Sequence, residues 1–298
     1  MPIQFIYATD LHGNFKKFNT ILQYAIKHNI KIIHLGADLL PKSINNTDIY
    51  SSLNIGISDT YQILIKKQKH FINTYLKDFF QSCKDNNITT LCFFGNDDNY
   101  SLKPDLKQYC SLLNEQPITL NDFTFMAYEY VCDYPFKNKT ACKLDNKFSI
   151  HEKLDYLGQT LRNCFEHITD YQQIKNLEHY FSTKSTIEDD LINIKIPQNT
   201  IFSFHMPPNK INLDCVGQHS QNKITLKSKV GSSSIYNWIS NNQPTLTLSG
   251  HIHENFEVTG KYKEFINNSL VIQPGQMKLT RFVIITINDS INTQLIEL

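Results

Sequence analysis

The stretch that decides the fold is residues 3–14, IQFIYATDLHGN. Its first part, Ile3–Thr9, is rich in β-branched and aromatic residues, which is typical of a buried strand. Asp10 and His12, two residue types that bind metals, follow this run at once. Apolar residues then recur at helical spacing across residues 15–26. The stretch therefore predicts a strand, an abrupt polar turn and a helix.

The same order of elements recurs through the first hundred residues. Lys31–Leu35 predicts a second strand that ends at Gly36, and Thr89–Phe94 predicts a third strand that ends at Gly95. Between them, an apolar stripe predicts a long helix at about residues 59–84. Strands that alternate with helices favour parallel pairing through right-handed crossovers, so we expect an α/β fold.

The rest of the chain is less regular. Residues 117–131 predict paired strands, and residues 185–188 predict the capped start of a short helix. Residues 132–196 contain no strong strand, with helical patterns at about 153–181, and we expect an insertion over one end of the sheet. Further strands are predicted at Thr200–Phe204, Thr245–Leu248, Leu270–Ile272, Phe282–Ile287 and Thr293–Ile296, with a short helix at Ser232–Asn241. No linker divides the chain, so we expect a single domain over residues 1–298.

Composition limits the possible partners. Lys+Arg 29 against Asp+Glu 28 gives a formal net charge of +1, so we expect no long duplex nucleic acid as a ligand. Arg162 and Arg281 are the only arginines, which nearly excludes paired-arginine phosphate clamps. No apolar run approaches the ~18 residues of a membrane span, and the start does not resemble a signal peptide. The seven cysteines are scattered without a disulfide pattern, so we expect a reduced, cytoplasmic protein; its oligomeric state is open.

Five turns that follow predicted strands carry metal-ligand residue types. They are residues 10–14 (DLHGN), 36–38 (GAD), 95–98 (GNDD), 204–208 (FHMPP) and 249–253 (SGHIH). Because the carboxyl ends of parallel strands share one edge of a sheet, we expect these turns to converge. A set of two Asp, one Asn and four His from these turns suits Mn, Fe, Zn or Co and is too rich in nitrogen for Ca. Seven ligands suit two ions that share a bridging carboxylate, which would turn a shared water into hydroxide near neutral pH.

Each of these residues taken alone has a simpler interpretation. A single histidine is more often a satisfied or exposed side chain than a ligand. Asp10 could cap the following helix, and Asn96 and Asp98 could be turn residues. His34, in the middle of a predicted strand, is expected to pack in the core or to support the site. The conjunction of five successive turns, with D-x-H and H-x-H spacings, favours a shared metal site.

The turns resemble those of the calcineurin-like metallophosphoesterases, whose pattern is D-x-H, G-D, G-N-H-[DE], H and G-H-x-H in this order. The similarity extends from Asp10 to His253, and residues 273–275 (QPG) resemble the N-P-G found near the end of the family pattern. The resemblance implies a four-layer α/β/β/α sandwich of two packed mixed sheets, with a dinuclear site at one edge. It implies that the first metal is bound by Asp10, His12, Asp38 and His253. It implies that the second is bound by Asp38, Asn96, His205 and His251, with Asp38 bridging.

Two residues depart from the family pattern. Ala37 separates Gly36 from Asp38, and Asp97 stands where the family has a catalytic histidine. That histidine stabilises the transition state and protonates the leaving alkoxide. An ionised Asp97 accepts hydrogen bonds only and would repel an anionic substrate. Phosphate monoesters, which are dianions with poor leaving groups, should suffer more than diesters. The next residue, Asp98, matches an acidic position that would orient a neighbouring histidine.

These observations lead to the hypothesis of a dinuclear-metal-dependent hydrolase that cleaves a small phosphodiester through a metal-bridging hydroxide. Nucleotides are among the candidate substrates. The candidate catalytic residues are Asp97, Asn96 and His251, and the candidate substrate contacts are Asn14 and Asn96. A protonated Asp97 or a metal-bound water would replace the missing histidine as proton donor. One alternative is a phosphomonoesterase or nucleotide phosphatase. The other is a non-catalytic metal-binding scaffold, which the presence of all seven ligand residues disfavours.

Overall fold

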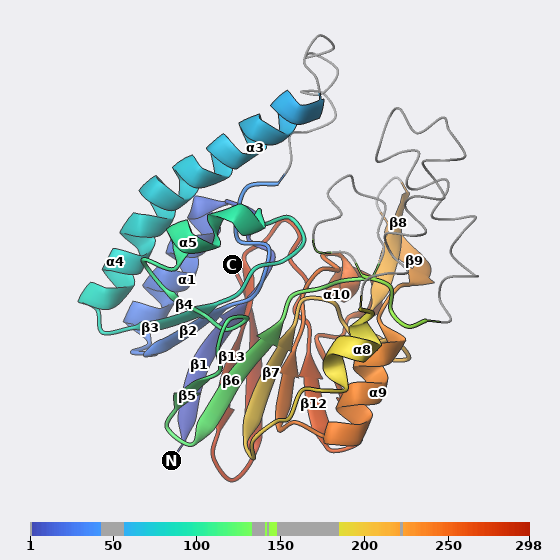
Figure 1. The fold of residues 1–298 in the computed structure, drawn as a ribbon. Helices are drawn as coiled ribbons and strands as arrows, with labels where there is room; N and C mark the ends of the chain where they lie inside the picture. Colours follow the sequence, from blue (N-terminus) through green and yellow to red (C-terminus); the bar gives the residue numbers. More distant parts are fainter. Residues whose placement is uncertain (1, 43–56, 133–140, 142, 148–184, 221–222) are drawn as a thin grey trace.

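The computed structural model describes residues 2–42, 57–132, 141, 143–147, 185–220 and 223–298 (Figure 1). Two six-stranded mixed sheets pack face to face, with α1, α3, α4 and α5 outside the first sheet and α8 and α9 outside the second. The helices of these two outer layers span Phe15–Lys27 (α1), Ile57–Phe71 (α3), Lys77–Asp85 (α4), Lys103–Leu106 (α5), Ile187–Leu191 (α8) and Ser233–Asn242 (α9). This arrangement confirms the expected four-layer α/β/β/α sandwich.

The first sheet has the order β14-β13-β1-β2-β3-β4. Its strands are β1 (Ile3–Ala8), β2 (Ile32–Leu35), β3 (Thr89–Cys92), β4 (Ser111–Leu112), β13 (Arg281–Ile287) and β14 (Ile291–Glu297). Strands β1 to β4 are parallel, as the alternation with helices predicts, and β13 joins β1 in the antiparallel sense. The turns after β1, β2 and β3 therefore lie at one edge of this sheet.

The second sheet has the order β11-β12-β10-β7-β6-β5. Its strands are β5 (Ile118–Leu120), β6 (Phe123–Tyr128), β7 (Thr200–Phe204), β10 (Leu246–Leu248), β11 (Lys263–Ile266) and β12 (Ser269–Ile272). Strands β6, β7, β10 and β12 are parallel. A separate hairpin, β8 (Cys215–Ser220) and β9 (Lys223–Lys229), lies against the short helix α10 (Asn255–Thr259).

Apolar periodicity explains the layers. In α1 the buried stripe Phe18, Ile21, Leu22 and Ala25 packs on the first sheet. The expected long helix is interrupted by a π-helical turn at Ile72–Leu76, between α3 and α4. The alternating residues of the strands fill the space between the sheets, for example Phe5, Phe125, Leu248 and Val283. Both faces of the parallel strands are thus buried, which is the usual environment of parallel sheets.

Several elements differ from the sequence expectations. The hairpin and β11 are absent from them, because each of these strands has only a few apolar residues among polar ones and so carries a short hydrophobic signal. The short helix near residue 187 is confirmed, and its capping box joins Thr186 to Asp189. The helical pattern at 153–181 lies outside the described residues. Within the expected insertion, the described Leu144, Ile187 and Leu191 are buried against the second sheet and α9.

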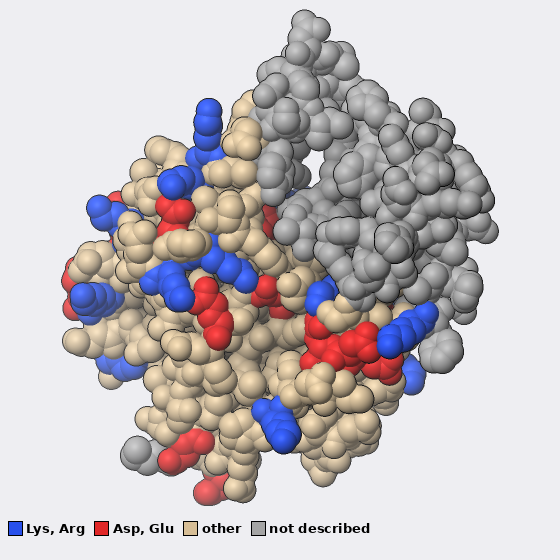
Figure 2. Space-filling view, viewed as in Figure 1, with Lys and Arg blue, Asp and Glu red and all other residues tan. Residues whose placement is uncertain are grey.

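The described surface mixes both signs of charge. Figure 2 shows Lys and Arg interspersed with Asp and Glu over the visible face, with an acidic group over α8. This face presents no broad basic tract among its described residues, in keeping with the near-neutral sequence. Within the described ranges, no helix has the length and apolar character needed to cross a bilayer.

His34 of β2 is buried between the two sheets. Its ring centroid lies 5.4 Å from that of Tyr7 and 5.8 Å from that of Phe125. A hydrogen bond of 3.2 Å joins its Nε2 to Ser203 Oγ on β7, in the opposite sheet. Burial lowers the pKa of His34 to about 3, so the imidazole is neutral in the folded protein. This is the core interpretation given for His34 above, and the residue ties the two sheets together.

We expect His34 to make the fold sensitive to acid. Its pKa in the folded state lies below the ~6.5 of an unfolded histidine, so its contribution to stability is lost as pH falls below ~6.5. Between pH 7 and pH 5 this loss amounts to about 2 kcal/mol. Over the same pH range, the free energy of unfolding of the variant His34→Phe should fall by about 2 kcal/mol less than that of the wild type. Urea denaturation of both proteins at both pH values measures the difference, and equal pH dependence would contradict the assignment.

Candidate metal centre

The turns after β1 and β2 are joined by backbone hydrogen bonds. The N–H of Asp10 donates to the carbonyl of Ala37 (3.0 Å), and the N–H of His12 donates to the carbonyl of Asp38 (2.9 Å). Asp10, His12 and Asp38 all have positive φ, at 56°, 46° and 57°. Non-glycine residues adopt this left-handed backbone at a cost that is typical of functional sites. The inserted Ala37 takes part in this pairing, and Asp38 still faces Asp10 and His12.

The first cluster comprises Asp10, His12, Asp38 and His253. One ligand atom from each lies within 4.8 Å of all the others. The two Nε2 atoms of His12 and His253 are 2.9 Å apart, and His253 Nε2 lies 3.6 Å from Asp10 Oδ1. Both carboxylates are buried. Two imidazole nitrogens and two carboxylates directed at one point form a donor set that fits a divalent transition-metal ion.

A second set lies on the other side of Asp38. Asn96 Oδ1 is 2.7 Å from His205 Nε2 and 2.8 Å from His251 Nδ1. His205 Nε2 is also 3.3 Å from Asp38 Oδ2, while His12 Nε2 lies 3.9 Å from the same oxygen. The Asp38 carboxylate therefore faces both sets. His251, like the first three turn residues, has positive φ, at 68°.

The electrostatics of the two sets are those of a site that attracts cations. Burial opposes ionisation of Asp38, but the adjacent His205 outweighs it and holds the pKa of Asp38 well below its usual range. Burial lowers the pKa of His205, but Asp38 outweighs this and raises it to about 9. Burial and the neighbouring His205 lower the pKa of His251 to about 3. Without a metal, a protonated His205 thus supplies the positive charge that the buried carboxylates need.

The match to known proteins agrees with this geometry. The family model of the calcineurin-like phosphoesterases matches residues 3–255. The chain belongs to this family. Among curated proteins, none matches the chain significantly.

Solved structures share the fold over nearly the whole length. The protein TT1561 of Thermus thermophilus is 12% identical, with 99% of each chain covered and a TM-score of 0.53. A dimetal phosphatase from Danio rerio is 8% identical, with 99% of this chain and 98% of that chain covered and a TM-score of 0.50. At such low identity, these similarities establish the fold of the phosphoesterase family and not a substrate.

Two glycines of the family pattern allow the turns to approach closely. A Cβ atom on Gly250 would lie 2.6 Å from Asp10 Oδ2, and one on Gly95 would collide with Asp38 Oδ1. Any larger residue at either position would push a carboxylate out of the cluster. The glycines before Asn96 and His251 are therefore required by packing against the two acids.

The residues that depart from the pattern or flank it have distinct surroundings. The partly buried carboxylate of Asp97 lies 3.7 Å from His12 Nδ1, beside the first cluster. The fully buried carboxylate of Asp98 accepts the N–H groups of Gly95, Leu39 and Leu40, and so fastens the turn after β3 to the turn after β2. That Asp98 also orients a histidine stays a prediction. Asn14 caps α1 by accepting the N–H of Lys17, and its contact with substrate likewise stays a prediction.

Gln68 of α3 supports the site and is absent from the sequence expectations. Its fully buried Nε2 donates to the carbonyls of Pro41 (3.0 Å) and Asp97 (2.7 Å). Its Oε1 accepts the N–H of Asn99 at 3.0 Å. The side chain thereby joins the two turns that carry Asp38 and Asn96. The sequence offers only one signal for this role, which is a polar residue on the inner face of an otherwise apolar helical stripe.

We expect Gln68→Leu to loosen both turns. It removes three hydrogen bonds and leaves two buried carbonyls and one N–H without partners, which costs about 2–3 kcal/mol. Metal affinity should fall about 10-fold, as it does when groups that support ligands are removed. Gln81→Leu, the same change at an exposed position on α4, is the control. Calorimetric titration with Mn²⁺ and urea denaturation measure the two effects; unchanged metal affinity in Gln68→Leu would contradict the role.

Proposed function

We propose that this phosphoesterase binds two divalent ions and hydrolyses a small phosphodiester. The observation that carries the proposal is the central position of Asp38, with a ligand set on each side and Asp97 at the border of the first set. The family supplies the reaction class, and the near-neutral charge favours a small phosphoester such as a nucleotide over long nucleic acid.

The two ligand sets would divide the ions between them. Asp10, His12, Asp38 and His253 would hold one ion, and Asp38, Asn96, His205 and His251 the other. Mn, Fe, Zn or Co suits this mixture of nitrogen and oxygen ligands. Such a pair activates water as the nucleophile and neutralises charge on the phosphoryl group. The protein would contribute the placement of the ligands, and the Asn96 amide and the His251 imidazole would also contact the phosphoryl oxygens.

Asp97 supports the preference for diesters. Burial, then the Asp38 carboxylate, raise the pKa of Asp97 to about 7. A cation held by Asp38 would offset the effect of that carboxylate, and Asp97 would then ionise more readily. An ionised Asp97 about 4 Å from a phosphoryl charge is repelled by on the order of 4 kcal/mol at an effective dielectric near 20. A dianionic monoester experiences more of this repulsion than a monoanionic diester.

A phosphomonoesterase is the second candidate, and one observation favours it. In the metal-free protein the pKa of Asp97 is about 7, and the share of Asp97 that stays protonated once metal binds could donate a proton to the leaving oxygen of a monoester. The gathering of all the predicted ligands around Asp38 argues against a scaffold without activity.

We expect Asp38→Ala to remove both ions and nearly all activity, because both sets share this carboxylate. Asp78→Ala, on the exposed face of α4, should retain wild-type metal content and serves as the control. Elemental analysis of protein reconstituted with Mn²⁺, together with circular dichroism to verify folding, measures the outcome. Wild-type metal stoichiometry in a folded Asp38→Ala variant would overturn the bridging assignment.

We expect Asp97→His to raise the activity on an aryl monoester relative to the matched aryl diester by about 10- to 100-fold, because the change removes a repulsive charge and adds a proton donor. Asp97→Asn removes the charge alone and should give a smaller rise. The measurement is kcat/KM for both substrates in the three proteins, at equal metal content. A flat ratio, or a wild-type preference for the monoester, would refute the role of Asp97 in substrate choice.

A further inference from the structure

The side chains of two cysteines that are separated in the sequence contact each other. Cys92 is the last residue of β3 and is fully buried, and Cys110, partly exposed, directly precedes β4. Their Sγ atoms lie 2.6 Å apart. The two thiols are therefore in direct contact, which is the arrangement that disulfide formation requires.

We propose that Cys92 and Cys110 are an oxidation site that forms an intramolecular disulfide with a low-molecular-weight disulfide, such as oxidised glutathione, as the oxidant. The bond would close the segment between the two residues, which carries Asn96, Asp97 and Asp98. The inference concerns covalent chemistry of the fold and is independent of the proposed substrate.

The exposure and the pKa of the two thiols determine which cysteine reacts first with the oxidant. Cys110 is the accessible partner, so its thiolate attacks one sulfur of the oxidant and releases one thiol, leaving a mixed disulfide. Burial, then the hydrogen bond to Cys110, raise the pKa of the Cys92 thiol well above its usual value, so Cys92 is the poorer first nucleophile. Cys92 then loses its proton and attacks Cys110 Sγ, which expels the second thiol. In sum, two protein thiols are oxidised and one disulfide is reduced to two thiols.

The backbone already holds the two cysteines in place. Leu91 and Cys92 of β3 pair with Ser111 and Leu112 of β4, and the N–H of Leu113 donates to the carbonyl of Cys92 at 2.9 Å. Cys92 is thereby fixed beside the residues that directly follow Cys110. Closing a loop removes conformations from the unfolded chain, so the oxidised protein should be more stable while its metal content stays the same.

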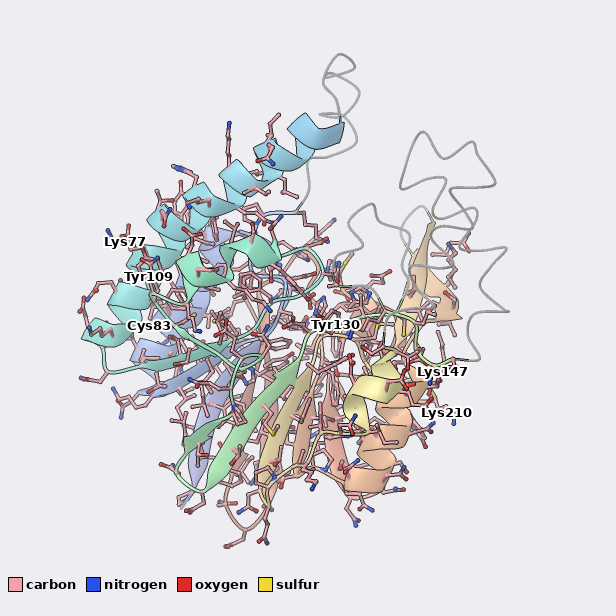
Figure 3. All side chains as sticks on the ribbon, in the orientation of Figure 1. Lys77, Cys83, Tyr109, Tyr130, Lys147 and Lys210 are labelled. Atoms are coloured by element: carbon pink, nitrogen blue, oxygen red, sulfur yellow. The ribbon has the colours of Figure 1, made fainter. Side chains whose placement is uncertain are left out.

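The test begins with incubation of the intact protein with oxidised glutathione. Remaining thiols are then alkylated in denaturant, and the peptides are mapped by mass spectrometry. We expect two fewer alkylated cysteines, a Cys92–Cys110 cross-linked peptide, and a higher Tm that dithiothreitol reverses. Cys83→Ser is the matched control, because Cys83 of α4 is buried in the same hydrophobic cluster. Figure 3 labels Cys83 and also Tyr109, which precedes Cys110 in the sequence. This variant should still form the cross-link.

Cys110→Ser should lose both the cross-link and the rise in Tm. If that variant does not fold, the comparison of oxidised and dithiothreitol-reduced wild type decides the question. The proposal is overturned if Cys92 and Cys110 both remain alkylatable after oxidation. It is equally overturned if Cys110 stops at a stable mixed disulfide with glutathione, or if the cross-link joins other cysteines.

Discussion

The structure depends on the burial of two carboxylates, Asp10 and Asp38, at the edge where the two sheets meet. A buried charge needs partners, and these partners come from both sheets. The backbone N–H of His251, from the second sheet, donates to both Asp10 oxygens at 3.0 and 3.1 Å, and His205 approaches Asp38 to 3.3 Å. The N–H of Asp97 donates to Asp38 Oδ1 at 2.8 Å within the first sheet. The two sheets must therefore align so that all these strands end at one place.

This alignment requires unfavourable backbone conformations in the turns, and contacts elsewhere in the fold stabilise them. Four of the predicted ligand residues adopt left-handed backbone, among them Asp38 and His251. Supporting side chains hold them there: Asp98 and Gln68 join the turns of the first sheet, while Gln273 donates to the carbonyls of Gly250 and Ile252 in the second. These bonds are buried, and the apolar layer between the sheets fixes the strands from which the turns emerge. A preorganised ligand set follows, because no single turn can move without breaking bonds to another.

The sequence predicts the parts that follow from short-range patterns. Strand ends, the helix of α1 and the seven residues that meet around Asp38 are visible as runs and turns, and the family resemblance supplies the packing of two sheets. The contacts of Gln68 and Asp98 depend on which turns become neighbours, so neither set could be assigned before the fold was known. The Cys92–Cys110 pair is hidden for the same reason, since β3 and β4 pair only after an intervening segment has folded back. In the hairpin β8–β9, only Ile224 and Leu226 alternate with polar residues, and this run is too short for a strand to be recognised from it.

Asp97 shows why a departure from a family pattern has more than one consequence. Its carboxylate faces His12 Nδ1 at 3.7 Å, which is beyond hydrogen-bond distance, so it supports this imidazole through its charge alone. On the other side of the ring, His12 Nε2 lies 3.9 Å from Asp38 Oδ2 and 2.9 Å from His253 Nε2. A histidine at position 97 would offer a proton to the leaving group but would withdraw this support from His12. Under the proposed function, the aspartate would thus replace a proton donor with a negative charge beside the first cluster. Such an exchange would suit the phosphodiester that we propose as the substrate, because its leaving group and its single charge place less demand on a proton donor.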